Sequence, residues 1–136
     1  MNTDHPLRTP PMPTRHFSVS QHFFFDAAHT LRREIEAEGS RRVHGHTYHA
    51  EVAISGPRDP DTGMVVDLGL LRERLKDVRE RLDHHMLDDV PDLGIPTLEN
   101  LCLFIADALA DMQPPPSSVR VWRDALGDGC TLRLDG

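Results

Sequence analysis

The segment HGHTYHAEVAIS, residues 44 to 55, is the feature that most constrains the fold of this chain. Apolar and polar residues alternate along it, and a period of two is typical of a β-strand with one buried face. His44 and His46 are in phase with the apolar positions that end at Ile54. The first two residues of this strand on its predicted buried face are therefore histidines, and aliphatic residues follow on the same face. The burial of two polar imidazoles requires an explanation.

A metal ion is one such explanation. Residues i and i+2 of a strand point to the same side, with Cα atoms roughly 6.5 to 7 Å apart, so both imidazoles can reach one ion. His29 ends the apolar face of another period-two segment, residues 17 to 29, and a hairpin-like pairing would bring it alongside. Three histidines with an open position are typical of a zinc ion that takes part in chemistry. We therefore predict a Zn²⁺ site at His29, His44 and His46. For a single histidine, simple cover of a strand end would be the better interpretation.

The rest of the chain predicts two helices and two short strands. Asp67 and Thr97 can each cap a helix. Segments 118 to 124 and 129 to 134 have the character of strands. The predicted inner faces of the helices are Leu71, Leu75, Val78 and Leu82 in the first, and Leu101, Phe104, Ile105, Ala108 and Met112 in the second. The order predicts an α+β domain with a mostly antiparallel sheet and helices on one face. Its unpaired sheet edges favour association with copies of itself.

Composition narrows the classes of protein and of partner. The length suits one domain, residues 15–136, preceded by a disordered Pro-rich arm, residues 1–14. A net charge of -7 with 15 Lys and Arg argues against nucleic acid as a partner. A membrane partner is not expected, because no apolar run approaches the roughly 20 residues of a membrane span. Cys102 and Cys130 lie in different contexts and predict no disulfide, so we expect a cytoplasmic location.

A second cluster with chemical potential is Asp83 and His84, in RLDHHML after the first predicted helix. A carboxylate beside an imidazole can orient the ring and stabilise its charged form, as in proton shuttles. The alternative is a capping and solvation role, and spacing alone does not decide between the two. We expect His85 to face solvent or a subunit contact. By sequence alone, Asp88 and Glu99 are ordinary surface acids.

The motifs FDAAH, VHGHTYHAEVAISG, TGMVVDL, LDHHML and PTLEN occur in the order seen in 6-pyruvoyltetrahydropterin and 6-carboxytetrahydropterin synthases. The chain resembles this family over about residues 16 to 134. The resemblance implies the tunnelling fold: a four-stranded antiparallel sheet with two helices, assembled into a β-barrel ring as a trimer or homohexamer, with active sites at subunit interfaces.

The resemblance also implies roles for particular residues. Histidines matching His29, His44 and His46 bind zinc in the family. Catalytic proton transfer across the subunit interface would use Asp83 and His84. The residues matching Thr97 and Glu99 help to bind the pterin, which is the small-molecule substrate.

Two departures from the family pattern bear on the substrate. The family places a catalytic cysteine four residues before the His-Gly-His pair, where this chain has Ser40, and a serine hydroxyl is far less acidic than a thiol. A glutamate of the penultimate strand binds the pterin edge in the family. Here the valine alternation places Arg123 at that position, and alignment from the DGC end places Asp124 there. An arginine only donates hydrogen bonds and would repel the N–H groups of a pterin.

Three functions are therefore open. The first is a zinc-dependent carbon–oxygen lyase or synthase of the family's usual kind, acting on a dihydroneopterin-triphosphate-like substrate, as in pterin or queuosine biosynthesis. The second is a divergent enzyme of specialised metabolism that acts on a small molecule other than a pterin. The third is a non-catalytic binding module.

Overall fold

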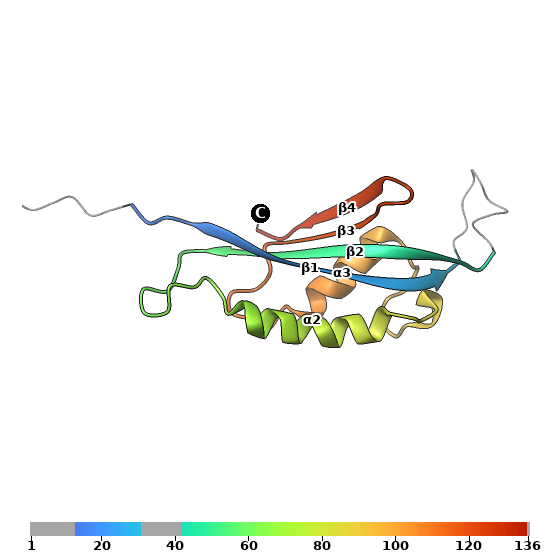
Figure 1. The fold of residues 1–136 in the computed structure, drawn as a ribbon, viewed down its shortest axis with the longest axis horizontal. Coiled ribbons are helices and arrows are strands. Elements are labelled where there is room, and N and C mark those ends of the chain that lie inside the picture. Colours follow the sequence, from blue (N-terminus) through green and yellow to red (C-terminus); the bar gives the residue numbers. More distant parts are fainter. Residues whose placement is uncertain (1–12, 31–41, 136) are drawn as a thin grey trace, which may run out of the picture.

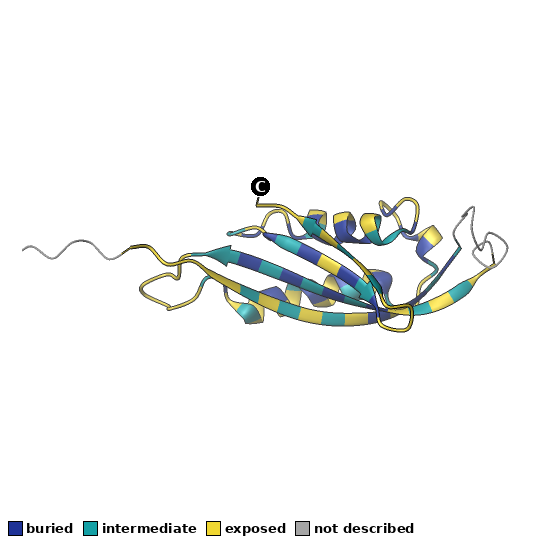
Figure 2. Ribbon diagram, turned by 90° about the horizontal axis from the view of Figure 1, so that it is seen from above, coloured by how far each residue is buried: buried dark blue, intermediate teal, exposed yellow. Residues whose placement is uncertain are grey.

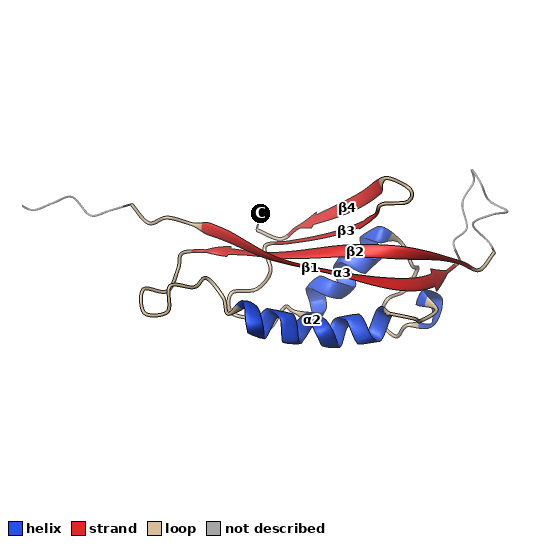
Figure 3. Ribbon diagram, in the orientation of Figure 1, coloured by secondary structure: helices blue, strands red, loops and turns tan. Residues whose placement is uncertain are grey.

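The computed structural model describes residues 13–30 and 42–135, which form one antiparallel sheet with helices on one of its faces (Figure 1). Residues 1–12 of the predicted arm, and Ser40, lie outside the described residues. The strands are β1 (Phe17–His29), β2 (His44–Gly56), β3 (Ser118–Arg123) and β4 (Asp128–Arg133), in the order β1-β2-β3-β4. The helices are α2 (Leu68–Leu82), α3 (Leu98–Ala108) and a short 3-10 turn, η1 (Leu87–Asp89). The predicted α+β architecture is confirmed (Figure 3).

The long hairpin of β1 and β2 places the histidines. Its two strands pair antiparallel over their whole length, with His29 opposite His44 and Ala27 opposite His46. Buried and exposed residues alternate along the strands, as the view onto the sheet shows (Figure 2). All three histidines of the predicted metal site therefore lie at one end of the hairpin, on the face that the helices cover.

The helices begin at the predicted caps. Asp67 accepts a hydrogen bond from the Gly69 backbone N–H (2.8 Å), and Thr97 accepts one from the Asn100 backbone N–H (3.1 Å). These side chains satisfy N–H groups that a helix start otherwise leaves unpaired. The predicted apolar stripe of α2 is buried, and that of α3 is buried except for the half-buried Ala108. The prediction that Met112 belongs to this helix is wrong, because α3 ends at Ala108 and Met112 is buried in the segment after it. The core lies between these stripes and the inner face of the sheet.

The chain that leaves α2 docks on the free edge of β1. The His84 backbone N–H donates to the Asp26 carbonyl (2.7 Å), and the Ala28 N–H donates to the His85 carbonyl (3.1 Å). Met86 completes this short parallel bridge to Ala28. The bridge fixes Asp83 and His84 beside β1, close to the end of the hairpin that carries the three histidines.

The remaining edge of the described sheet is β4, which pairs with β3 alone. Cys102 and Cys130 are free thiols, and the buried Cys102 donates to the Cys130 carbonyl (3.5 Å). Burial raises the pKa of the Cys102 thiol to about 12, so this side chain is a small core residue. Within the described residues, neither helix combines the length and the apolarity needed to cross a membrane.

Candidate functional site

The rings of His29, His44 and His46 converge at the end of the hairpin. Their centroids are 4.5 Å apart for His29 and His44, and 4.9 Å apart for each of the other two pairs. One ring nitrogen from each histidine lies within 4.8 Å of the others. The convergence that the sequence predicted is present, and its cause is the β1–β2 register.

Hydrogen bonds orient two of the three rings. The Pro96 carbonyl accepts from His29 Nδ1 (3.2 Å), and the Arg42 carbonyl accepts from His44 Nδ1 (2.8 Å). A carbonyl oxygen only accepts, so each Nδ1 carries the hydrogen and each Nε2 keeps its lone pair. This is the arrangement in which proteins fix metal-binding imidazoles.

Two of the free nitrogens are buried without a partner. His29 Nε2 and His46 Nε2 have no hydrogen-bond partner within the described part of the chain. Buried polar atoms in native proteins are nearly always satisfied, so an unsatisfied pair that faces one point needs an explanation. A cation bound between the rings satisfies both atoms.

The protonation state of the rings also suits a cation. Burial lowers the pKa of His29, and it lowers the pKa of His46 to about 4, with the positive charge of Arg123 acting in the same direction. Both imidazoles are therefore neutral at pH 7, which is the form that binds a metal. Three imidazole nitrogens fit Zn²⁺ with one position left open for a substrate oxygen.

A pocket of about 310 Å³ adjoins this cluster and brings together three of the predicted substrate-binding residues. Thr97, Glu99 and Arg123 line it, together with His29, Tyr48, Pro96, Leu98 and Asp128. The Tyr48 ring forms the wall next to the histidines, with centroid distances of 6.2 Å to His29 and 5.7 Å to His46. The Arg123 Cζ atom lies 5.9 Å from the same ring.

Arg123 is a buried cation held by one carboxylate. It is 4 % exposed, and it donates to Asp128 from Nε (2.9 Å) and from Nη2 (2.6 Å). These bonds raise the pKa of Arg123 above its ordinary value, so the guanidinium stays charged. Asp124, the alternative candidate, instead contacts His49 (3.2 Å) and the Trp122 Nε1 atom (3.1 Å). Asp124 is absent from the lining of this pocket.

The predicted Asp83–His84 contact is present at the free edge of β1. His84 Nδ1 lies 3.0 Å from Asp83 Oδ2. Asp83 also accepts from the Asp26 backbone N–H (2.9 Å) and pairs with Arg79 (3.3 Å). The Asp26 bond, followed by the charge of Arg79, lowers the pKa of Asp83. A fixed, ionised carboxylate therefore supports an exposed imidazole.

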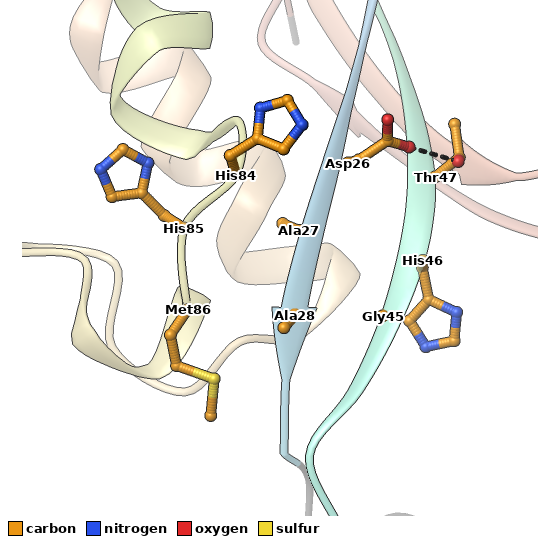
Figure 4. A pocket seen from close by; sticks show the side chains of 9 residues that line it. All are labelled: Asp26, Ala27, Ala28, Gly45, His46, Thr47, His84, His85 and Met86. Atoms are coloured by element: carbon orange, nitrogen blue, oxygen red, sulfur yellow. Dashed lines mark hydrogen bonds between the residues drawn. The ribbon is translucent and has the colours of Figure 1, made fainter.

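Within one chain, His84 and the three histidines lie on different sides of the hairpin. Figure 4 shows β1 and β2 running between the His84 ring and the His46 ring. Both residues line an open pocket of about 540 Å³, together with Asp26, Ala27, Ala28, Gly45, Thr47, His85 and Met86. Asp26 accepts a short hydrogen bond from Thr47 in the same pocket (Figure 4).

Among the residues that line these two pockets, sequence reasoning missed Tyr48, Asp128 and Asp26, whose side chains carry hydroxyl or carboxylate groups. Tyr48 continues the phase of His44 and His46, which is the signal that could have identified it. Asp128 could have been found by pairing β3 with β4, which sets it opposite Arg123. Asp88, taken as an ordinary surface acid, accepts from the Thr30 backbone N–H (2.9 Å) and hydroxyl (2.6 Å).

Comparison with known proteins agrees with this geometry. The sequence profile described as PTPS, 6-pyruvoyl tetrahydropterin synthase, matches residues 18–133. The chain belongs to this family. It is similar to a putative 6-carboxy-5,6,7,8-tetrahydropterin synthase of Archaeoglobus fulgidus, with 36% identity over 97 residues, 71% of this chain and 79% of that protein. The corresponding Synechocystis synthase is 34% identical over 103 residues, 71% of this chain and 78% of that protein.

Solved structures of the PTPS family share the fold. The 6-pyruvoyl tetrahydropterin synthase of Caenorhabditis elegans superposes with a TM-score of 0.77 at 22% identity, covering 91% of this chain and 99% of that one. A Plasmodium vivax 6-pyruvoyltetrahydropterin synthase, altered at a catalytic residue, gives a TM-score of 0.67 at 19% identity, with 88% and 98% covered. The four-stranded sheet with two helices is therefore the tunnelling fold.

Proposed function

We propose that this protein is a zinc-dependent lyase that moves protons on the hydroxylated side chain of a small substrate such as dihydroneopterin triphosphate. The observation that carries this proposal is the convergence of His29, His44 and His46, with two buried Nε2 atoms that have no hydrogen-bond partner among residues 13–30 and 42–135. A structural zinc usually has four protein ligands, whereas three histidines leave a position open. Membership of the PTPS family supports the same reaction class.

The residues of the chain have distinct roles in this proposal. Zn²⁺ held by the three histidines acidifies a substrate hydroxyl or an adjacent C–H when it is bound. His84 takes up and returns the proton, and Asp83 orients its ring and stabilises the charged form. Arg79 and the Asp26 backbone N–H keep Asp83 ionised and in place.

The active site is completed between copies of the chain. Because β1 and β2 separate His84 from the histidine cluster, His84 of one copy serves the zinc of a neighbour. The exposed His84 side chain and the open pocket around it suit such a contact. Partners are therefore other copies of this chain and a small molecule.

A second candidate function is favoured by Arg123. This buried guanidinium sits in the pocket next to the histidines, where the donor edge of a pterin would need an acceptor. A zinc enzyme with the same proton chemistry and a substrate other than a pterin is the alternative.

The test is turnover by the zinc-loaded protein. Dihydroneopterin triphosphate is incubated with the wild-type protein, and products are followed by mass spectrometry. We expect His84→Asn to lower the turnover rate by a factor of about 100 to 10,000 while the protein still retains zinc. Asparagine is chosen because His84 has a φ of 58°, which asparagine tolerates better than most residues. Full activity in His84→Asn would refute the assigned role.

Ser40 gives a further comparison for the same assay. If Ser40 takes no part in proton transfer, Ser40→Ala keeps the wild-type rate. A loss as severe as that of His84→Asn would show that Ser40 is part of the proton path. Gain of pterin turnover in Ser40→Cys would show that this lineage lost the thiol base of the family.

A further inference from the structure

We propose that Arg123 selects a substrate that presents an anionic or carbonyl acceptor, most simply a carboxylate, to the pocket beside the histidine cluster. The inference rests on the zinc site of the proposed function, and it specifies the substrate of the second candidate, a zinc enzyme that acts on a molecule other than a pterin. It is carried by the position of Arg123, its burial and the geometry of its ion pair with Asp128.

The first step is the cost of burial. A buried charge with incomplete hydrogen bonding is strongly unfavourable, so native proteins pair it or use it. Arg123 is 4 % exposed, yet it borders a pocket rather than the packed core. An apolar side chain at this position would fill the wall without that cost. The buried guanidinium therefore indicates that the pocket binds a ligand through hydrogen-bond donors of the protein.

The second step is the count of donors. A guanidinium has five N–H groups and no acceptor. Asp128 takes two of them, from Nε and Nη2, along one side of the group. The Tyr48 ring lies beside the same group, with its centroid 5.9 Å from the Arg123 Cζ atom. N–H groups at the far end remain, and they form the fork that binds a carboxylate in two parallel hydrogen bonds.

The third step concerns the acceptors. Asp128 lines the pocket, but each of its two carboxylate oxygens already accepts a hydrogen bond from Arg123. It therefore cannot also bind the N–H edge of a substrate through both oxygens. Glu99, the other carboxylate of the lining, is exposed at the rim. The fixed, buried group of this pocket is therefore a donor. It complements an acceptor, and it opposes the N–H edge of an aminopyrimidinone.

The experiment measures binding of three probes to the zinc-loaded full chain by isothermal titration calorimetry. Tartrate offers hydroxyls and carboxylates, threitol offers the same hydroxyls without carboxylates, and neopterin offers an aminopyrimidinone edge. We expect tartrate to bind about tenfold to hundredfold more tightly than threitol, as one charged hydrogen-bonded pair predicts, and more tightly than neopterin.

Three variants assign that preference to Arg123. A carboxylate also binds Zn²⁺ more tightly than a hydroxyl does, so the tartrate-to-threitol ratio is compared with its wild-type value, and in Arg123→Met it falls about tenfold to hundredfold. In Asp128→Asn it falls severalfold, since the guanidinium is present but no longer fixed; Asp128 is partly exposed, so this variant keeps the core intact. Arg120→Met is the matched control: Arg120 is on the same strand but exposed and stacked on Trp122, and the ratio stays at the wild-type value.

The outcomes separate this inference from the proposed function. A tartrate-to-threitol ratio in Arg123→Met that equals the wild-type ratio, or neopterin binding that depends on Glu99 and not on Arg123, overturns the inference. Stoichiometric zinc with equal affinity for tartrate and threitol also overturns it, and leaves the zinc-dependent function standing. Absence of zinc refutes the proposed function, whereas an Arg123-dependent tartrate preference in that zinc-free protein still supports the acceptor site.

Discussion

At the scale of single residues, the histidine cluster shows how position in a strand changes the chemistry of a side chain. Nine histidines are present in the chain, and among those that the structure describes, His29, His44 and His46 are distinguished because strand pairing brings their rings together. His22 and His49, on the opposite face, hydrogen-bond to each other (3.0 Å) and stack. A histidine count alone would not distinguish these two groups.

This contrast gives a prediction for zinc binding. Purified wild-type protein retains stoichiometric zinc after dialysis against a weak chelator. His29→Ala lowers zinc affinity by a factor of about 100 or more, because two imidazoles remain where three were needed. His22→Ala, on the same strand but the other face, retains zinc. The measurement is elemental analysis of both variants, and equal zinc loss in the two would contradict the assignment.

A second prediction concerns pH and Asp83. Hydrogen bonding by the Asp26 N–H and the charge of Arg79 hold the pKa of Asp83 below its ordinary value of 3.8, so the folded protein releases this proton more readily than the unfolded chain. Asp83 therefore stabilises the fold above about pH 4, and this contribution disappears as pH falls through the lowered pKa. We expect Asp83→Asn to cost about 1 kcal/mol at pH 7 and less at pH 3, which lies below the ordinary pKa of the carboxyl. Thermal unfolding at both pH values measures this, and a constant difference would show that charge is not the cause.

At the scale of elements, one helix cap has two roles, because the residue that begins the helix also lines the pocket. Thr97 caps α3, and it also lines the pocket with Arg123. Thr97→Ala should lower the free energy of unfolding by about 0.5 to 2 kcal/mol, since the Asn100 N–H loses its partner. Thr97→Ser keeps the hydroxyl and should restore most of that stability. Urea unfolding separates the two variants, and equal loss in both would point to the methyl group instead of the cap.

Periodicity and caps predicted these elements because each depends on local chemistry. The alternation of β1 and β2, the buried stripe of α2 and the cap at Asp67 could all be read from neighbouring residues. The bridge from the end of α2 to the edge of β1 could not, since it depends on backbone hydrogen bonds between distant segments.

The same distinction holds for the site. The position of His29 beside His44 and His46 could be predicted, because a hairpin has a simple register and the periodicity of a strand shows which residues share a face. The ion pair of Arg123 and Asp128 depends on the turn between β3 and β4, whose length sets the register. Without that register, the sequence left Arg123 and Asp124 as equal alternatives.

At the scale of the whole molecule, the two clusters of one chain lie apart, which is the reason that the proposed function places each active site between two copies. The histidine cluster lies on the helix-covered face of the hairpin, and His84 lies beyond the edge of β1. A single chain therefore presents the parts of a site on two separate surfaces. If each site combines one part from each of two copies, two different inactive variants can complement each other.

This gives a direct test with His44→Ala and His84→Asn. Under the proposed function we expect each variant alone to be inactive, because His44→Ala removes a zinc ligand and His84→Asn removes the acid/base. When equal amounts are unfolded and refolded together, or co-expressed, random assembly unites an intact histidine cluster with an intact His84 at about a quarter of the sites. Recovery of about a quarter of wild-type turnover is therefore expected. A site contained within one chain would regain nothing, because every chain in the mixture carries one defect.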